Sequence, residues 1–366
     1  MAKGLGSILT KIPTSSITDS SVGITSLVTS GSASASTYLH GDLSWATVSV
    51  SGKINTAGSD PVTNTAGDIW YTGGKFKFTT NQTLNSVWSS ANSCSSGCTK
   101  TVGCGTQSAG LKWGGETPPG TGVRVDTEEF NGVSWANGGN LNYGRTQPGG
   151  LGIQTAALCD GGHTHTGTPK YTSSETYDGS SWTNSATDPG GSRYGPGAVG
   201  TNSAGLMAVG YNCGQDVREW DGTSFIAAAN YPQGSGTGVQ NPTAFGTQTA
   251  ATLSAGYTNT RIQNTNEYDG TSWAAGNNNP VDTNGSSGYG TQSAGLQVSG
   301  YIGSYTTQCY GYDGTSWYTG GTCIEASQQS AFGGSASSGF REAGNNVTNG
   351  TEAEVLERAV IKFIGT

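Results

Sequence analysis

The segment Tyr268-Asp269-Gly270-Thr271-Ser272-Trp273 places two aromatic residues five positions apart around an Asp-Gly pair. Aspartate and glycine both tolerate the positive φ angles of a tight turn, so this pair between two extended segments favours a β-hairpin. A four-residue connection sets the two aromatics opposite each other on one face, where a cross-strand pair contributes about 0.2 to 1 kcal/mol. The segment therefore predicts a hairpin with one aromatic face to bury.

The same element occurs five times along the chain. Each copy reads aromatic, Asp or Asn, Gly, any residue, Ser, aromatic, and the copies span 130–135, 177–182, 220–225, 268–273 and 312–317. Trp88 lacks the Asp-Gly pair but stands 17 residues before the next repeated element, where the other five aromatics stand 17 to 21 residues before theirs. The hairpin aromatics that close each unit are then Trp88, Trp135, Trp182, Phe225, Trp273 and Trp317.

A second element, Gly-Thr-Gln-Ser/Thr-Ala-Gly/Ala-Leu in its clearest copies, alternates with the hairpins. We call its first residue the lead glycine; another glycine, the second glycine, follows ten residues later in every copy. A strand that approaches a crowded axis needs positions without Cβ, which accounts for both sets. The lead glycines are Gly105, Gly152, Gly200, Gly246, Gly290 and Gly334, and the second glycines are Gly115, Gly162, Gly210, Gly256, Gly300 and Gly344.

The lead glycines recur every 44 to 48 residues, which is the length of one blade of a β-propeller. Helical solenoids are excluded because glycine costs about 1 kcal/mol per helical position and no 3.6-residue apolar rhythm is present. We expect an all-β fold, a six-bladed propeller with four strands in each blade. The first strand ends near the lead glycine, the second runs to the second glycine, and the hairpin supplies the other two.

The ends of the repeat array indicate how the ring closes. The last repeat begins at Gly334 and has no aromatic hairpin after it, whereas Trp88 stands ahead of the first repeat. We therefore expect an N-terminal outer strand near Trp88 to complete the sixth blade, which removes unpaired sheet edges.

Composition divides the chain into two predicted domains. Residues 1–63 are rich in Ser, Thr, Ala and Gly, have few aromatics, and are expected to form an extended arm or linker. Residues 64–366 are expected to form the propeller. Within it, 64–92 supply a hairpin and the closing strand, about 93–350 the repeats, and 351–366 the C-terminal strand or strands, with 359–364 as an extra edge strand or a docking segment.

Charge and hydropathy exclude several classes of protein. The formal net charge is −8 and no basic stripe occurs, which argues against a sequence-independent nucleic-acid binder. No stretch approaches the roughly 18 to 20 apolar residues of a membrane span, and the first residues carry too short an apolar run for a secretory signal. We expect neither nucleic acid nor membrane insertion.

The repeats resemble the kelch-like propeller repeats of bacteriophage virion proteins, tail-fibre and other appendage proteins among them. The resemblance rests on copies such as 267–273 followed by 290–296 and covers about residues 64–350. Ahead of the repeats, 66–78 is similar to a short hairpin that precedes such domains in phage fibres, and 36–46 resembles a fibre linker motif. That motif departs from its usual pattern at His40, where a basic residue is typical.

The resemblance implies a structural protein of the virion and not an enzyme. We expect a tail-fibre or appendage subunit, made in the host cytoplasm without a signal peptide and assembled as a homo-oligomer such as a trimer. Residues 1–63 would bind other virion proteins, and the propeller loops would act as an adhesin for a host-surface glycan or protein. The alternatives are a phage polysaccharide-degrading enzyme and a capsid decoration protein without receptor contact.

Candidate binding residues lie in the longest loops, those of the first two repeats, because variation in loops on a repeated scaffold is typical of a binding surface. They are Arg124, His163, His165 and Tyr171. His163 and His165 alternate along the chain and are also candidate ligands of a divalent metal, the other reading being an exposed polar loop. We expect no cofactor and no catalytic residue.

Other chemistry-bearing residues are explained by the repeat or lie scattered. Glu129, Glu219 and Glu267 each precede a hairpin aromatic, so we expect a structural role. The acids that break the pattern, Asp160, Asp188, Asp216, Asp282 and Glu325, do not group in the sequence. The seven cysteines are Cys94, Cys98, Cys104, Cys159, Cys213, Cys309 and Cys323. Their odd number leaves at least one thiol unpaired within the chain, and the first three favour a short-range disulfide or plain thiols over zinc.

Overall fold

The computed structural model of the protein describes residues 88–118, 120–165, 170–234, 236–342, 344–345 and 352–356, together with the backbone of several further strand segments. The described residues form strands and turns and contain no helix, so none of them belongs to a helix that could span a membrane. The chain divides into two compact units, residues 1–82 with 360–366 and residues 83–359.

The first unit contains two small sheets. Strand β1 (Thr37–Leu39) pairs antiparallel with β2 (Trp45–Thr47). Strand β4 (Ile69–Thr72) pairs parallel with β3 (Ile54–Asn55) and antiparallel with β5 (Lys75–Phe78), which places a hairpin within 66–78, as expected. The predicted domain boundary between residues 63 and 64, and the segment 359–364, lie outside the described residues.

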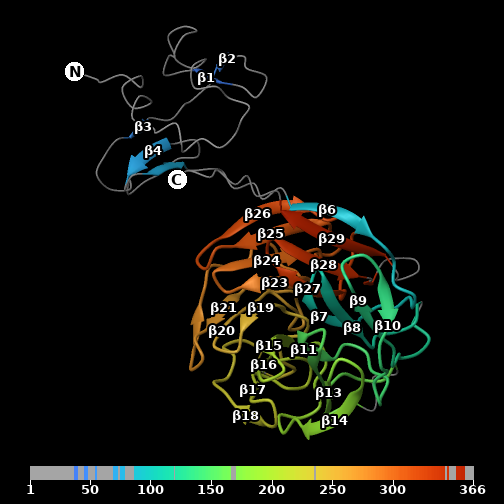
Figure 1. Ribbon diagram of the computed structural model, residues 1–366. Helices are drawn as coiled ribbons and strands as arrows, with labels where there is room; N and C mark the ends of the chain where they lie inside the picture. Colours follow the sequence, from blue (N-terminus) through green and yellow to red (C-terminus); the bar gives the residue numbers. More distant parts are fainter. Residues whose placement is uncertain are drawn as a thin grey trace. The chain divides into compact units, whose positions relative to one another are not determined.

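The second unit is a six-bladed β-propeller, as the sequence predicts (Figure 1). Blade one contains β7 (Val102–Thr106), β8 (Ala109–Trp113), β9 (Thr127–Phe130) and β10 (Trp135–Asn137), and blade two β11 (Gly149–Ile153), β12 (Ala156–Asp160), β13 (Ser173–Tyr177) and β14 (Trp182–Thr187). Blade three contains β15 (Gly197–Thr201), β16 (Ala204–Ala208), β17 (Val217–Trp220) and β18 (Phe225–Ala227). Blade four contains β19 (Thr243–Thr247), β20 (Ala250–Ser254), β21 (Thr265–Tyr268) and β22 (Trp273–Ala275).

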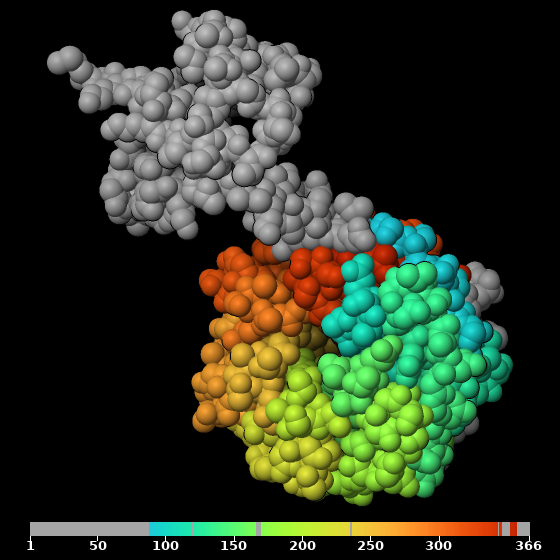
Figure 2. Space-filling model, in the orientation of Figure 1, coloured from blue at the N-terminus to red at the C-terminus, as the bar shows by residue number. Residues whose placement is uncertain are grey.

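Blade five contains β23 (Ser287–Thr291), β24 (Ala294–Val298), β25 (Gln308–Tyr312) and β26 (Trp317–Thr322), and blade six β27 (Ala331–Ser335), β28 (Ser338–Glu342), β29 (Ala353–Arg358) and β6 (Ser86–Ala91). The first strand of each blade lies beside that of the next, and β27 lies beside β7, so the ring is closed. Figure 2 shows this ring with a hollow at its centre.

The aromatic hairpins form as predicted. Tyr268 pairs directly with Trp273, and their rings lie 4.9 Å apart. The carboxylate of Asp269 accepts hydrogen bonds from the backbone N–H groups of Thr271 and Ser272, which fixes the turn. The first aromatic of each hairpin is buried, and the equivalent pairs in the other blades are Phe130–Trp135, Tyr177–Trp182, Trp220–Phe225 and Tyr312–Trp317.

Repeated polar contacts join neighbouring blades near these hairpins. The Tyr268 hydroxyl donates a hydrogen bond to Glu219 of the preceding blade at 2.8 Å. The Gln248 amide donates to the backbone carbonyls of Gly205 and Trp220, also of the preceding blade. The same glutamate contact recurs in Tyr177–Glu129 and Tyr312–Glu267, and the same glutamine contact in Gln154 and Gln292. The repeated Glu and Gln are therefore structural, as expected for the glutamates.

The two sets of glycines lie in different surroundings. The lead glycines lie on the first strand of each blade, where a Cβ would lie 2.2 to 2.4 Å from a backbone oxygen of the paired strand, so the close approach that the sequence suggests applies to them. The second glycines lie beyond the second strand and not on a strand at the axis; Gly162 has a φ of 88° and a Cβ there would lie 2.9 Å from the Thr146 carbonyl oxygen. All twelve glycines have positive φ, which other residues adopt at a cost. Close approach between blades at the axis falls instead on glycines such as Gly288, whose Cβ would lie 2.2 Å from Ala244 O.

Strand β6 closes the ring as predicted. Leu356 of β29 pairs with Trp88 of β6, and Trp88 is buried against Tyr289 of blade five. The outer strand of blade six therefore comes from the chain segment that precedes blade one.

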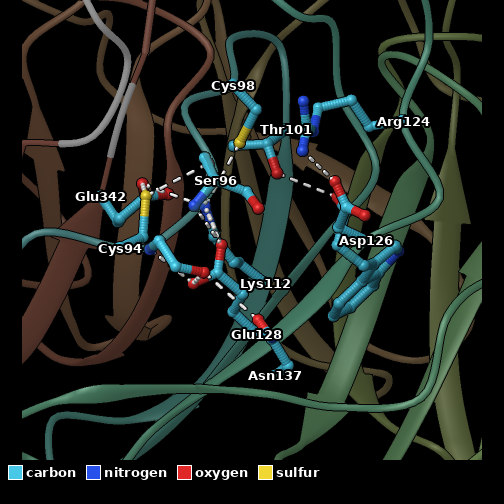
Figure 3. A network of polar contacts seen from close by, with 12 residues as sticks. Cys94, Ser96, Cys98, Thr101, Lys112, Arg124, Asp126, Glu128, Asn137 and Glu342 are labelled. Carbon is cyan, nitrogen blue, oxygen red and sulfur yellow. Dashed lines mark hydrogen bonds and ion pairs between the residues drawn. The ribbon is translucent and has the colours of Figure 1, made fainter.

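A buried polar network strengthens this joint (Figure 3). The Lys112 ammonium of blade one lies 3.2 Å from carboxylate oxygens of Glu128 in the same blade and of Glu342 in blade six. It also lies 3.4 Å from Cys98, in the segment that follows β6, and Ser95 of that segment donates to Glu128. Burial raises the pKa of the Glu342 carboxyl to about 7, although Lys112 acts in the opposite direction.

Candidate binding face

The antiparallel blades give the ring two different ends. The turns within each pair of strands, including all the Asp-Gly hairpins, lie at one end, which we call the hairpin end. The longer connections, from the second to the third strand and from each blade to the next, lie at the other, which we call the loop end. All four binding candidates from the sequence, Arg124, His163, His165 and Tyr171, lie at the loop end.

The residue after each second glycine occupies an equivalent position at the loop end. It forms a short antiparallel bridge to the segment that leads into its own blade, as in Tyr194 with Tyr211 and Asn284 with Tyr301. We call these six positions the axial belt. Its members are Glu116, His163, Tyr211, Tyr257, Tyr301 and Asn345.

An aromatic cluster with one cation joins blades two and three at the belt. The ring of Tyr194 lies 4.4 Å from that of His163 and 4.8 Å from that of Tyr211. The Lys170 ammonium, from the loop of blade two, lies 4.6 Å from the centre of the Tyr211 ring. Tyr194, Tyr211 and Lys170 are all partly exposed, so part of the cluster that they form is accessible to a ligand.

Blades four and five repeat this arrangement. The Arg261 guanidinium, from the loop of blade four, lies 5.6 Å from the centre of the Tyr301 ring in blade five. Tyr301 packs against Tyr305 at 5.4 Å, and Tyr257, between the two clusters, is 37% exposed. A cation from one blade thus lies over the belt tyrosine of the next at two places on the same face.

Electrostatics distinguish the cations from the histidine in these clusters. Burial lowers the pKa of His163, and its Nε2 lies 3.1 Å from the side-chain oxygen of Gln147. Burial thus favours the neutral form of His163. Positive charge in the two clusters comes from Lys170 and Arg261.

Polar residues and glycines surround the central axis of the ring at its loop end. Lys100, Gln147, Asn241 and Gln329, with two glycines at the equivalent positions, adopt positive φ. Each of five successive backbone N–H groups donates to the carbonyl of the previous blade, at 2.7 to 3.0 Å, as in Gln147 to Lys100. These residues line a cavity with a volume of about 80 Å³. It has room for only a few waters and is much smaller than the roughly 300 Å³ or more of a typical ligand pocket.

The two histidines of the proposed metal pair have different partners. His163 contacts Gln147 and Tyr194, whereas the exposed His165 has its Nδ1 3.8 Å from Glu116. Within the described parts of the chain, no three histidine, cysteine or acidic side chains are arranged to hold a metal ion.

The other two candidates lie outside the aromatic clusters. Arg124 forms an ion pair with Asp126 and donates to the Thr117 hydroxyl. Tyr171 packs 6.1 Å from Tyr143 and lies under the guanidinium of Arg145 at 4.8 Å.

Three of the five pattern-breaking acids, although far apart in the sequence, meet in the structure. Asp188 and Asp216 lie 2.8 and 2.6 Å from the buried Arg193 guanidinium. Asp160 is fully buried beside them and accepts a hydrogen bond from Ser174. Burial, followed by the charge of Asp188, raises the pKa of Asp160 to about 7. The cluster lines no part of the axial cavity and joins blade two to blade three.

Sequence reasoning did not single out the belt tyrosines Tyr211, Tyr257 and Tyr301, nor Tyr194, which pairs with Tyr211. One signal could have found three of them, since the residue directly after the second glycine is His or Tyr in four of the six repeats.

The fold defines the protein as a six-bladed, all-β propeller. No protein-family model and no curated protein sequence matches this chain.

Proposed function

We propose that the protein is a non-enzymatic binding subunit of a bacteriophage tail fibre or other appendage, and that its loop end binds a glycan of the host surface. The observation that carries the proposal is the pair of tyrosine and cation clusters on one face, Tyr194–Tyr211–Lys170 and Tyr301–Tyr305–Arg261. Partly exposed aromatic rings offer flat apolar faces with polar edges, which suits sugar rings. The resemblance of the repeats to phage virion proteins supports the setting.

The surroundings of the three acids Asp160, Asp188 and Asp216 favour a binding protein over a polysaccharide-degrading enzyme. Asp188 and Asp216 are engaged by Arg193, and Asp160 lies fully buried, so the three carboxylates have no open space for a sugar between them. A polysaccharide-degrading enzyme needs two carboxylates placed on either side of a bound substrate.

An array of bacterial surface polysaccharides tests the glycan proposal. The full chain should bind a subset of them, and Tyr211→Ala and Tyr301→Ala should each weaken that binding at least roughly tenfold if the rings are hot spots. Ile226→Ala, at an exposed position of the hairpin end (53% exposed), is the matched control and should bind as the wild type does. Equal losses in all three variants, or shortening of the bound polysaccharide, would refute the proposal.

The setting in a virion has its own test. Antibody labelling of intact phage particles should locate the protein on the tail or another appendage, and removal of residues 1–60 should prevent its incorporation. Symmetric labelling over the head would identify a capsid decoration protein instead.

A further inference from the structure

Two buried thiols lie together in blade five. Cys309 is in β25 and Cys323 follows β26 directly, and the two are 0% and 4% exposed. Their sulfur atoms approach the same backbone oxygen, that of Thr307, at 3.8 and 3.3 Å, and the two side chains are hydrogen-bonded to each other.

The pairing of the two strands sets this geometry. Gln308 pairs with Thr322 and Tyr310 with Thr319, so β26 has one extra residue opposite Cys309. Cys323 continues β26 and donates its N–H to Thr307 at 2.9 Å. The two cysteines are therefore diagonal neighbours across the pair, next to a β-bulge that increases the local twist.

The bulge itself does not require thiols. Blade two has the same irregularity between Ser173 and Glu175, and the residues equivalent to the two cysteines there are Ser174 and Asp188. A serine and an aspartate thus occupy the same two backbone positions in blade two. The cysteine pair is therefore a property of blade five and not of the propeller repeat.

The two thiols are chemically unequal. The hydrogen bond from Cys309, with the nearby charge of Arg341, lowers the pKa of Cys323, whereas the same hydrogen bond and burial raise that of Cys309. Cys323 is the more exposed of the two, so an external disulfide meets the more readily ionised sulfur first.

We propose that Cys309 and Cys323 form an intrablade disulfide when the protein meets a small-molecule disulfide such as oxidised glutathione. The Cys323 thiolate attacks one glutathione sulfur, forms a mixed disulfide and releases one glutathione thiolate. Cys309 then loses its proton to solvent and attacks the Cys323 sulfur, which releases the second glutathione. The two protein thiols are oxidised by two electrons, and one oxidised glutathione is reduced to two thiols.

The disulfide would tie the two outer strands of blade five beside the closing blade. Residues just after Cys323 contact that blade, since the N–H groups of Ile324 and Glu325 donate to Glu354. The link closes a loop of about 15 residues in the unfolded chain, which restricts the unfolded state. A reducing cytoplasm would keep the pair as thiols, and an oxidising exterior would favour the link.

Mass spectrometry of the folded full chain tests the proposal. After incubation with oxidised glutathione, the protein should be about 2 Da lighter than the reduced protein, not counting alkylation adducts. After alkylation, peptide mapping should show Cys309 joined to Cys323. Its thermal midpoint should rise by roughly 5 °C or more and return on reduction.

Two variants serve as controls. Cys309→Ser, with Cys309→Ala as a second choice should it fold poorly, should accumulate a stable glutathione adduct on Cys323. Cys159→Ser, at another buried cysteine (0% exposed), should form the link as the wild type does. Absence of the Cys309–Cys323 peptide from the oxidised native protein, or its formation only after unfolding, would overturn the proposal.

Discussion

The two ends of the ring are held together in different ways. At the hairpin end the same contacts recur from blade to blade, such as Tyr268 with Glu219 and Tyr312 with Glu267. At the loop end the contacts that recur are backbone hydrogen bonds, such as Gln147 to Lys100. Individual buried charges add to them, Lys112 at the closing joint and Arg193 between blades two and three. The side-chain contacts between blades are therefore repeated at the hairpin end, whereas those of the loop end differ from blade to blade.

The largest effect is expected at the closing joint, which lies at the loop end. Lys112→Met leaves Glu128 and Glu342 buried without their cation, so the free energy of unfolding should fall by about 3 to 5 kcal/mol. Denaturant titration measures it. Lys100→Met is the matched control, because its pair with Glu116 is 29% exposed on the lysine side and should cost at most about 1 kcal/mol. Equal losses of unfolding free energy in Lys112→Met and Lys100→Met would show that the buried lysine stabilises the protein no more than the partly exposed one does.

The next largest effect is a pH dependence of the free energy of unfolding, which originates from Asp160 at the loop end. Asp160 ionises near pH 4 in the unfolded chain but has a pKa of about 7 when folded. Between pH 4 and 7 the folded protein therefore holds a proton on Asp160 that the unfolded chain has released. The stability that this proton contributes is fully present below about pH 4 and is lost as the pH rises through about 7.

Asp160→Asn removes this titration. The variant should lose stability less steeply than the wild type between pH 4 and 7, and at pH 8 it should be more stable by about 1 to 3 kcal/mol. Glu342, whose pKa is also raised to about 7, retains part of this slope, whereas His163 and Glu128, whose pKa values are lowered, act in the opposite direction. Unfolding free energies across the pH range measure both curves, with the exposed Asp282→Asn as the control; parallel curves for Asp160→Asn and the wild type would contradict the assignment.

The smallest effect concerns the repeated contacts of the hairpin end. Tyr268→Phe removes one hydrogen bond to Glu219 and should cost about 1 kcal/mol. Tyr211→Phe, on the partly exposed belt, should change stability by less than about 0.5 kcal/mol. A loss at Tyr211 equal to that at Tyr268 would show that the belt tyrosine stabilises the fold as much as the repeated contacts of the hairpin end do.

The hairpin end could be predicted from sequence because its determinants are local. The Asp-Gly or Asn-Gly turns and the aromatic pairs each lie within one repeat. Six lead glycines give six blades, and five hairpins leave the closing role to Trp88. The loop end could not be predicted in the same way. Lys112 and Glu342 are far apart in the chain, as are Asp160 and Asp216, and only the closed ring brings them together.

The candidate site was predicted in part for the same reason. The loops of blades one and two were expected to bind, and His163 does belong to an aromatic cluster of the belt. The cluster itself needs Tyr194 and Tyr211 from the next blade and Lys170 from the same loop. Contacts between blades are not encoded in any single repeat, so the loops could be proposed from sequence but not their partners.

We propose that a glycan binds the loop end and not the hairpin end. Hydrogen exchange of the full chain, with and without the surface polysaccharide that binds most strongly on the array, tests it directly. We predict slower exchange at 161–165, 209–216 and 299–306, and unchanged exchange at the hairpin turns 178–181, 221–224 and 269–272. Protection confined to those hairpin turns, with none at the belt, would contradict the account.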